Sequence, residues 1–414
     1  MPDYVEMGIL RLCMKKKTNI QLASHEACTG CKACASICPT NSIAMCENQN
    51  GFLQPHIDAD TCIGCHKCEN TCPIILKNEN KCADIKVYAA VIKDEDFLQR
   101  SSSGGMFYAL AKWTIEQDGV VFGAAFDGIH LKHQYAETVQ GIEPFMGSKY
   151  VQSDTADSFS KVKSFLDEDR WVLYSGTPCQ IAGLKKYLHK DYDKLVTVDL
   201  ICHGVPSASI WEKYISRLMK RIGAKDIKSI RFRTKDWSVG NEKDMLNFYL
   251  SLSFLKADGE WKQYKKYWNE DPYFKFFMRH IFRPSCYQCT FRNIDASYAD
   301  FTIGDCWNAG KDHPQMPIEK GISTIICHTE KAKIVFERIK QTMIVEEEPL
   351  SIMQNRYAVD KLDTETEAKK RMWRTSNYLA QYIPLENLQW LYLHDRIDFI
   401  IRRKFQKIWK RNTK

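Results

Sequence analysis

The chain has 414 residues, of which 44% are hydrophobic and 27% charged, a composition typical of a globular protein with two or three domains. Its 59 Lys and Arg exceed its 51 Asp and Glu, but residues 396–414 hold eight basic residues and one Asp, so the remainder is nearly neutral and general nucleic-acid binding is not indicated. No secretion signal or apolar spanning segment is visible, and the 17 cysteines suit a reducing compartment, so we expect a cytoplasmic protein.

Two cysteine motifs near the N-terminus predict an α+β, ferredoxin-like module over residues 20–76. The chain reads CTGCKACASICP from Cys28 and CIGCHKCENTCP from Cys62, and both segments follow the pattern C-x2-C-x2-C-x3-C-P. In this pattern three thiolates bind one 4Fe-4S cluster and the fourth binds the other cluster. The predicted ligand sets are Cys28, Cys31, Cys34 and Cys72 for one cluster, and Cys62, Cys65, Cys68 and Cys38 for the second. A pair of zinc sites is the alternative, but it usually shows two separated C-x2-C pairs.

Beyond the polar linker that follows residue 76, strands and helices alternate and predict an α/β domain. Residues 86–92 and 120–126 predict buried strands, with a helix between them that ends at Gly119. Two further units run from strand through turn to helix, namely RWVLYSG into TPCQIAGLKKYLHK and KLVTVDLICHG into VPSASIWEKYISRLM. The segment LNFYLSLSFLKADGEWKQYKKY predicts a β-hairpin around Asp258 and Gly259, and therefore a mixed sheet.

Four more cysteines lie in turns that are rich in glycine and proline. Cys179 (GTPCQ) and Cys202 (CHG) follow successive predicted strands, and Cys286 and Cys289 form a C-x2-C pair. Because neighbouring strands open toward the same crevice, we expect these four thiols to meet and to bind a third 4Fe-4S cluster or a structural zinc. A redox-active thiol is the second interpretation of Cys179. The other cysteines are interpreted as bystanders or small core residues: Cys13, Cys46, Cys82, Cys306 and Cys327.

The segment RSSSGG, residues 100–105, precedes a predicted helix. Hydroxyl groups and glycines at a helix N-terminus can present free N–H groups to a phosphate of a nucleotide cofactor. The segment matches neither the G-x-G-x-x-G fingerprint nor a Walker loop, so it indicates no standard dinucleotide site. Taken alone, it is more simply explained by an ordinary Ser N-cap.

The order and spacing of five motifs resemble the beta subunit family of coenzyme F-420 hydrogenases and dehydrogenases. The motifs are SSSGGMFYAL, GTPCQIAGL, CHGVPS, RPSCYQC and YADFTIGDCW. The resemblance implies an N-terminal-like region over residues 85–165 and a C-terminal-like region over residues 166–340. With the ferredoxin module added, the chain looks like the fused bacterial and archaeal members, some of which are encoded with polysaccharide biosynthesis genes. It also resembles the plant enzyme that reduces 7-hydroxymethyl chlorophyll.

This resemblance implies an α/β flavin-binding domain that carries FAD and its own cluster on the second cysteine set, with Cys306 as a candidate replacement ligand. Lys149 would offset negative charge on a reduced flavin. His203 would donate a proton or hydrogen-bond a cluster sulfur, and no catalytic residue is assigned. The implied FAD-binding residues are Ser101, Ser102, Ser103, Gly104, Gly105, Gly147, Ser148, Lys149, Tyr150, Gln152, Thr177 and Gln180.

The implied function is that of an FAD-dependent iron–sulfur oxidoreductase, with polysaccharide biosynthesis as an expected context. It would move electrons between a ferredoxin-like or deazaflavin carrier and a small-molecule substrate. A non-catalytic electron-transfer subunit of a larger redox complex is the alternative, and an iron–sulfur scaffold without flavin is the third hypothesis. Neither the substrate nor the oligomeric state follows from the residues.

The family resemblance does not cover residues 345–414, which we expect to form a helical, basic extension. Apolar side chains recur at helical spacing over residues 388–414, and eight basic residues lie among them. Two interpretations stay open. The helix either docks on the core of its own protein or lies as a peripheral contact on the anionic inner face of a membrane.

Overall fold

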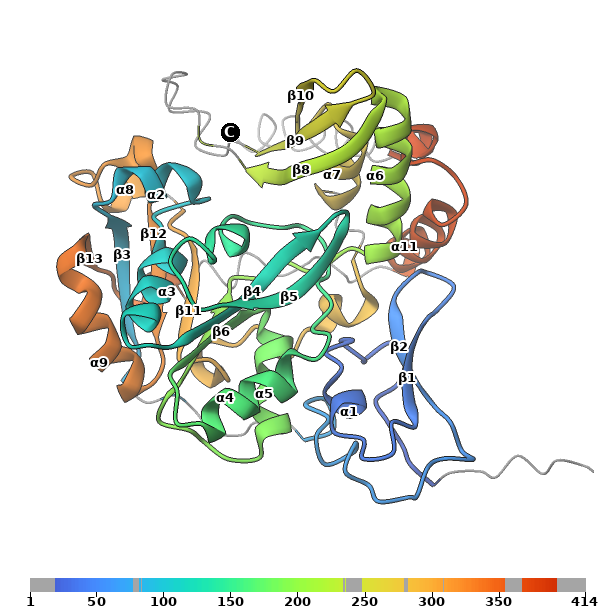
Figure 1. Ribbon diagram of the computed structural model, residues 1–414, viewed down its shortest axis with the longest axis horizontal. Helices are drawn as coiled ribbons and strands as arrows, with labels where there is room; N and C mark the ends of the chain where they lie inside the picture. Colours follow the sequence, from blue (N-terminus) through green and yellow to red (C-terminus); the bar gives the residue numbers. More distant parts are fainter. Residues whose placement is uncertain are drawn as a thin grey trace, which may run out of the picture.

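The computed structural model describes residues 19–76, 82, 84–233, 235, 248–278, 282–307, 309–353 and 367–392. A small cysteine-rich module lies beside a large α/β domain, and a second, smaller sheet lies at the far end of that domain (Figure 1). The structure thus divides the described chain into three packed parts.

The N-terminal module contains one short helix and one antiparallel hairpin. These elements are α1 (Ala33–Ser36), β1 (Ile43–Glu47) and β2 (Leu53–Ile57). The apolar centre of the module is small, with Ile20, Ile43 and Cys68 as its buried members. Gly30 and Gly64 have φ angles of 70° and 67°, a left-handed conformation that glycine adopts without steric cost.

The α/β domain is built on one eight-stranded mixed sheet, as the sequence predicted. Neighbouring strands from β4 through β6 and β7 to β11 run parallel, whereas β5, β12, β3 and β13 pair antiparallel with their neighbours. In spatial order the strands are β13 (Met343–Glu347), β3 (Lys86–Ile92), β12 (Ser323–Cys327), β11 (Phe301–Asp305), β7 (Leu195–Leu200), β6 (Val172–Gly176), β4 (Val120–Asp127) and β5 (His130–Ala136). The regions 85–165 and 166–340 therefore contribute strands to the same sheet.

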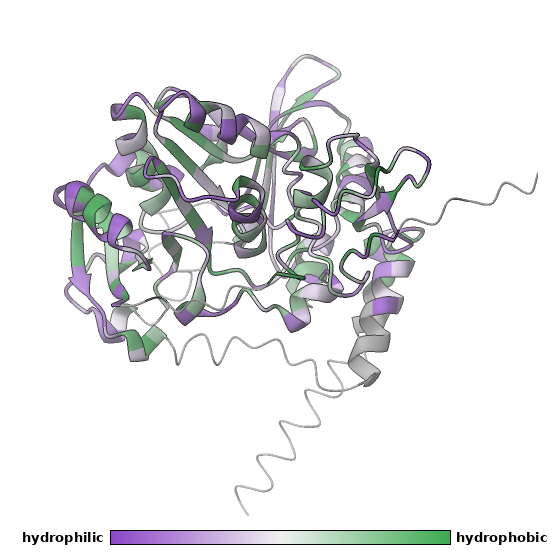
Figure 2. Cartoon of the chain, turned by 90° about the horizontal axis from the view of Figure 1, so that it is seen from below, coloured by the Kyte–Doolittle hydropathy of each residue, from purple (hydrophilic) through white to green (hydrophobic). Residues whose placement is uncertain are grey.

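Helices cover both faces of this sheet, which explains why its central strands are almost continuously apolar. Helices α3 (Met106–Glu116) and α9 (Glu330–Ile339) pack on one face, and α4 (Ser158–Asp167) and α5 (Pro178–Leu188) pack on the other. Alternate residues of β6 face the two layers, because Leu173 belongs to the first core and Val172 and Tyr174 to the second. In Figure 2 the interior strands are largely hydrophobic, and hydrophilic residues are frequent on the surrounding helices and loops.

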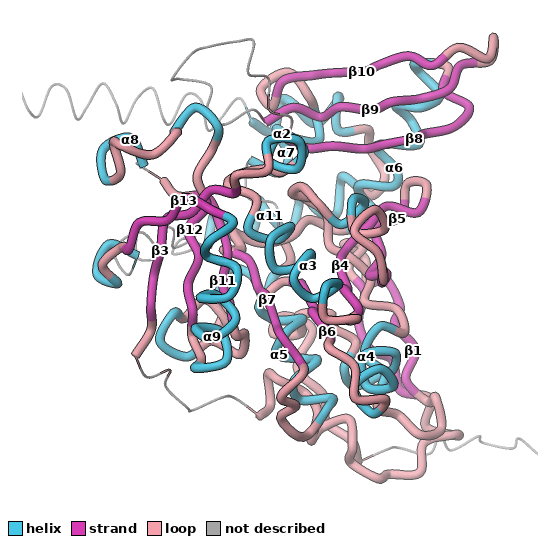
Figure 3. Tube along the Cα trace, turned by 60° about the vertical axis from the view of Figure 1, so that its left-hand side comes forward, coloured by secondary structure: helices cyan, strands magenta, loops and turns pink. Residues whose placement is uncertain are grey.

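The predicted hairpin around Asp258 and Gly259 is present, but it belongs to a separate sheet. Gly259, in the turn between its two strands, has a φ of 84°. This three-stranded antiparallel sheet lies apart from the main sheet (Figure 3) and packs against helices α6 and α7. Its elements are β8 (Ala224–Arg233), β9 (Phe248–Lys256), β10 (Trp261–Tyr267), α6 (Ala208–Ile222) and α7 (Pro272–Met278). The main sheet is mixed because of other antiparallel pairs, so the hairpin was the wrong reason for a correct prediction.

The described part of the C-terminal extension begins in a strand and continues as helices. β13 closes the main sheet at one edge, and α11 (Glu367–Ala380) and the 3-10 helix η7 (Leu385–Tyr392) follow. Gln381 ties this extension to its neighbours, because its side chain donates to Asn50 O and accepts from Ser209 and Lys213. The extension therefore holds the N-terminal module against α6.

The remaining short elements connect these layers. They are α2 (Glu95–Arg100), α8 (Ala309–Asp312), η1 (Glu143–Phe145), η3 (Pro284–Gln288), η4 (Ile294–Ala296), η5 (Ile318–Lys320) and η6 (Lys340–Thr342). No helix in the part of the chain that the structure describes has the length and apolarity to span a membrane. The basic tail that follows residue 392, Cys13 and most of the linker after residue 76 lie outside the described residues, so the interpretations of the tail stay predictions.

Candidate functional site

The first predicted cysteine set comes together in the N-terminal module. The thiols of Cys31, Cys28 and Cys72 all act on Cys34, whose pKa is raised first by burial and then by these neighbours. Burial raises the pKa of Cys31 to about 12. The Gly30 N–H donates to Cys28 Sγ over 3.4 Å, the approach of an amide to sulfur that the motif requires. The four thiols of this set, which come from two motifs, thus lie close together.

The second set lines a small cavity in the same module. Cys38, Cys62, Cys65 and Cys68 all border this cavity, together with apolar side chains such as Ile43. Burial opposes ionisation of Cys38, but hydrogen bonds from Thr40 and Ser42 outweigh it and lower the pKa of its thiol. The fourth cysteine of each motif therefore lies with the first three of the other motif, as the spacing predicted.

The third set gathers at the carboxyl ends of two adjacent parallel strands. Cys179 lies in the first turn of α5 directly after β6, Cys202 follows β7, and Cys286 and Cys289 lie in and just after η3. Burial raises the pKa of Cys202 well above its ordinary value, and the thiols of Cys286, Cys179 and Cys289 raise it further. Burial also raises the pKa values of Cys286 to about 12 and of Cys289 to about 11. The sequence-predicted proximity of these four thiols is confirmed.

A set of four thiols can bind either an iron–sulfur cluster or a single zinc ion. Tetrahedral zinc with Zn–S bonds of about 2.3 Å would bring its sulfurs to about 3.8 Å from one another. Among the described residues, Cys306, His313 and Glu348 form a group whose potential ligand atoms all lie within 4.8 Å of one another. Within the same described chain, none of the three cysteine sets forms such a group, so their spacing is wider than one zinc ion would require.

The first and third sets are direct neighbours. The Cys179 thiol is among the charges that act on Cys31, and Gly183, one turn after Cys179 on α5, packs against Cys31. A Cβ atom at Gly183 would lie 3.0 Å from Cys31 Sγ. The small residue allows helix α5, which carries Cys179, to approach the module this closely.

A buried arginine, not among the predicted site residues, lies at this junction. Arg283 is 1% exposed, and its guanidinium donates to Cys28 O at 2.8 Å, to Leu53 O at 2.6 Å and to Gln152 Oε1 at 3.1 Å. Burial lowers its pKa, whereas the neighbouring thiols, first those of Cys28 and Cys286, oppose the shift. Because an arginine stays protonated in proteins, a fixed positive charge lies between the two sets. Its position beside Pro284 in the RPSCYQC motif was the available signal.

Of the two loops implied to bind flavin, each contacts the other. The backbone N–H of Ser148 donates to Ser102 Oγ over 2.6 Å. Gly105 is the N-cap of α3, with a φ of 83° and no side-chain cap, so the interpretation of the segment as an ordinary Ser N-cap is wrong. Gly104 is required for packing, because a Cβ atom there would lie 2.2 Å from Ala90 O. Bulky substitutions at Gly104 would therefore disturb the fold itself.

Lys149 and Tyr150 are turned into the protein rather than toward an open cavity. The Lys149 ammonium donates to the backbone oxygens of Phe145, Met146 and Gly147, and burial lowers its pKa to about 7. The Tyr150 ring packs on Phe277 with centroids 4.5 Å apart, and burial raises the pKa of its hydroxyl to about 12. Their implied contacts with a flavin stay predictions.

The other implied flavin residues lie on the cluster side. Gln152 donates to Thr29 O in the N-terminal module and accepts from Arg283. Thr177 and Gln180 form a capping box at the start of α5, and Thr177 Oγ1 lies 3.2 Å from Cys179 Sγ. No hydrogen bond joins these three side chains to the loop of residues 101–105 in the described chain. The twelve implied residues therefore form two groups.

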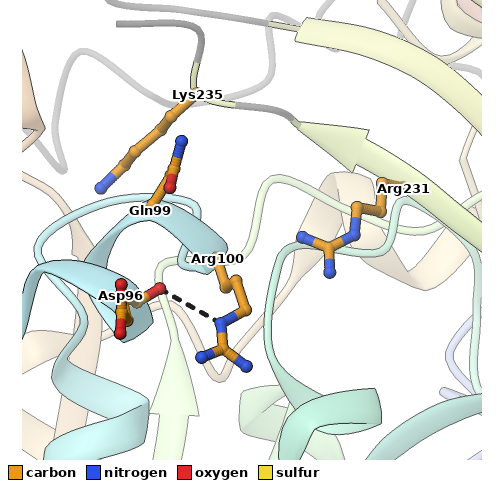
Figure 4. Close-up of a pocket in the computed structure, with 5 residues that line it drawn as sticks. All are labelled: Asp96, Gln99, Arg100, Arg231 and Lys235. Atoms are coloured by element: carbon orange, nitrogen blue, oxygen red, sulfur yellow. Dashed lines mark hydrogen bonds between the residues drawn. The ribbon is translucent and has the colours of Figure 1, made fainter.

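A cationic pocket that the sequence analysis also missed adjoins the loop of residues 101–105. This cavity of about 340 Å³ lies between α2 and β8 (Figure 4). Lys235 donates to Leu98 O and Ser103 O, and burial lowers its pKa to about 7. The pocket is lined by Asp96, Gln99, Arg100, Arg231 and Lys235. Its three basic side chains come from segments more than 130 residues apart, which explains why no local motif indicated it.

Comparison with known proteins supports both halves of this description. Residues 169–352 match the family described as coenzyme F420 hydrogenase/dehydrogenase, C terminus of the beta subunit, and residues 27–74 match the 4Fe-4S dicluster domain. No curated protein matches the chain. A solved structure of the F420-reducing NiFe hydrogenase complex from Methanosarcina barkeri contains a similar chain, with 17% identity and a TM-score of 0.43, over 68% of this chain and 89% of that chain. The two family matches confirm the resemblance that the motifs indicated and relate the chain to iron–sulfur oxidoreductases.

Proposed function

Because the chain joins a 4Fe-4S dicluster domain to a region of the coenzyme F420 hydrogenase/dehydrogenase beta subunit family, we propose that it is an FAD-dependent iron–sulfur oxidoreductase. It moves electrons between a ferredoxin-like or deazaflavin carrier and a small-molecule substrate. The link to polysaccharide biosynthesis is an expectation from the family resemblance alone. The single observation that carries the proposal is the direct contact between the first and third cysteine sets.

This contact supports a continuous electron path through the chain. Cys31 belongs to the first set and Cys179 to the third, and α5 brings them together across Gly183. The second set lies among residues of the same small module, whereas Cys31 of the first set packs in a core cluster of the α/β domain. An electron carrier that docks at the module could therefore pass electrons through the successive clusters to the interior of the α/β domain.

We infer that the third set holds a 4Fe-4S cluster rather than zinc. Four thiols are available, and their spacing is wider than a single tetrahedral ion requires, as is that of the two sets in the dicluster domain. Burial disfavours a bare thiolate at each of these cysteines, and a bound metal cluster would supply the compensating positive charge. The hydroxyl of Thr177, 3.2 Å from Cys179 Sγ, would hydrogen-bond to a ligand sulfur.

The cationic pocket and the loop beside it fit the phosphate part of FAD. The donor set is basic, and Lys235 orders the serine-rich loop by donating to the Ser103 carbonyl. A cavity of about 340 Å³ is at the lower end of the range of small-molecule sites and accommodates part of a dinucleotide. When bound, FAD couples two-electron chemistry to the single-electron steps of iron–sulfur clusters. Arg100 and Arg231 would offset phosphate charge, and the Ser102–Ser148 contact would hold the two loops together.

The proposal is tested by the iron, sulfide and flavin content of the full-length protein purified without oxygen. We expect about 12 iron atoms and one FAD per chain, because three cubanes carry about four irons each. Cys179→Ser should lower the iron content by about one cluster, whereas Cys46→Ser, at an exposed cysteine outside all three sets, should leave it unchanged. An unchanged iron content in Cys179→Ser would overturn the third cluster. A protein with clusters but without flavin would overturn the flavoenzyme.

Turnover of small-molecule substrates by the isolated chain, with reduced ferredoxin as the electron donor, distinguishes the two remaining hypotheses. An enzyme with its own substrate site should oxidise or reduce a small-molecule partner as an isolated chain. A non-catalytic subunit would bind iron and flavin but would exchange electrons only with a protein carrier.

A further inference from the structure

Three metal-ligating side chains meet in a buried place that is separate from the cysteine sets. Cys306 follows β11 directly, His313 follows α8 directly, and Glu348 follows β13 directly. One potential ligand atom from each lies within 4.8 Å of the other two. The three residues are 3%, 4% and 2% exposed, so the group is fully inside the protein. Cys306 is a buried member of the main apolar core, as the sequence predicted, and its thiol also faces two side chains that can bind a metal.

The orientation of His313 is that of a metal ligand. Its Nδ1 atom lies 2.7 Å from Glu346 Oε2, and its Nε2 atom points toward Glu348 Oε1 at 3.5 Å. The Nε2 atom is buried and makes no hydrogen bond. Ligating histidines generally donate one ring N–H to a carboxylate while the other nitrogen binds the metal. Glu346 supplies that carboxylate here.

We propose that Cys306, His313 and Glu348 bind one Zn²⁺ ion. Thiolate, imidazole and carboxylate are the three zinc ligands that proteins use, and a water molecule completes the four ligands of the ion. Tetrahedral zinc would place the three atoms about 3.3–3.6 Å from one another, and His313 Nε2 and Glu348 Oε1 already lie 3.5 Å apart. A cation also compensates the burial of a carboxylate and a thiolate side by side.

The ion would fasten the segment between β11 and β12 to the edge of the sheet. Cys306 begins this segment and His313 lies within it. Glu348 follows β13, the edge strand, which lies on the opposite side of β3 from β12 (Figure 1). The N–H of Cys306 and the hydroxyl of Ser103 both donate to Ile322 O, over 2.9 Å and 2.7 Å. The site therefore supports the loop of residues 101–105 through one shared carbonyl. It does not depend on whether that loop binds flavin.

Metal analysis of the full-length protein, purified without oxygen and dialysed against a weak chelator, tests the site. We expect about one zinc per chain in addition to the iron. His313→Gln and Cys306→Ser should each lose most of the zinc and keep the iron of the cysteine sets. Cys327→Ser, which changes another fully buried cysteine, should keep both metals and is the matched control. Protein without zinc, or zinc that survives both ligand variants, would overturn the proposal.

A zinc X-ray absorption spectrum of the unaltered protein keeps the test independent of how well the variants fold. One sulfur at about 2.3 Å with nitrogen and oxygen at about 2.0–2.2 Å is the expected first shell. A shell of four sulfurs would place the zinc in a cysteine set instead and would contradict this site. The same result would also contradict a third iron–sulfur cluster, whereas loss of flavin would leave the zinc site untouched.

Discussion

The two cysteine-bearing regions of the molecule are built in opposite ways. The ligands of the N-terminal module lie in two short motifs, and its apolar core contains little beyond Ile20 and Ile43. The third set comes from four positions between residues 179 and 289, held at the ends of β6 and β7 by a sheet with cores on both faces. We therefore expect bound metal to supply much of the stability of the module. The α/β domain has a large apolar core of its own, so its stability should depend little on metal.

Removal of the metal should produce the largest difference in stability between the N-terminal module and the α/β domain. When iron is removed by a chelator under reducing conditions, backbone amides of residues 19–76 should exchange about 1,000-fold faster, or about 4 kcal/mol. Amides of β6, β7 and β11 should remain protected because their core is apolar. Hydrogen–deuterium exchange measures both. Equal loss of protection in the sheet would show that the α/β domain also depends on its metal, and would contradict the proposed difference between the two regions.

The independent stability of the α/β domain should depend on pH through buried histidines. Burial lowers the pKa of His133 to about 4, whereas the unfolded side chain titrates near 6.5. The unfolded state therefore binds an extra proton between these values, so stability is present above pH 6.5 and is lost as the pH falls toward 4. His133→Gln should make this loss smaller by about 3 kcal/mol, measured by denaturation at each pH.

The control for this experiment is His130→Gln, at an exposed histidine three residues earlier on the same strand. His328, which burial also shifts to a pKa of about 4, should retain a similar part of the pH dependence in both variants. A pH profile of His133→Gln that matches the unaltered protein would show that the imidazole is not neutral and buried in solution.

Arg283 lies where the two cysteine-bearing regions meet, so its charge acts on clusters of both. Arg283→Met removes a positive charge next to two cysteine sets, and a reduced cluster carries one more negative charge. We expect the midpoint potentials of the neighbouring clusters to fall by on the order of 100 mV, measured by redox titration with electron paramagnetic resonance. Arg283→Lys should restore part of the potential, and Arg221→Met, at the surface pair with Glu386, should change nothing. Unchanged potentials in Arg283→Met would mean that the arginine is only a structural tie.

The cationic pocket gives the smallest expected effect. Arg100 and Arg231 each lie within 4 Å of Glu143, so part of their charge is already neutralised. Arg231→Gln should weaken FAD retention by about tenfold, which is about 1.4 kcal/mol, with the iron content unchanged. Flavin release during dialysis, followed by fluorescence, measures this difference. Full retention in a double variant with Arg100→Gln would place the phosphates elsewhere.

Local patterns in the sequence correctly predicted whatever depends on neighbouring residues. Strand β3 matches the predicted range of residues 86–92, and the hairpin turn is at Asp258 and Gly259, because alternation and turn chemistry act over a few residues. In the module, the fourth cysteine of each motif lies near the first three of the other motif, as the spacing predicted. The meeting of Cys179 with Cys202 was also predictable, since adjacent parallel strands end at the same edge of a sheet.

Local patterns therefore indicated the iron–sulfur motifs, the α/β class and the places where β6 and β7 end. Which antiparallel pairs make the sheet mixed, and which distant side chains meet, depends on the tertiary fold. Arg283 between two cysteine sets, the pocket of Arg100, Arg231 and Lys235, and the Cys306–His313–Glu348 group join residues from separate segments. Apart from the position of Arg283 in the RPSCYQC motif, no local spacing indicates these groups, because their contacts depend on sheet order and helix packing. Backbone propensity depends on residues a few positions apart. Burial and electrostatic interactions depend on side chains that are distant in the sequence and that the fold places in contact.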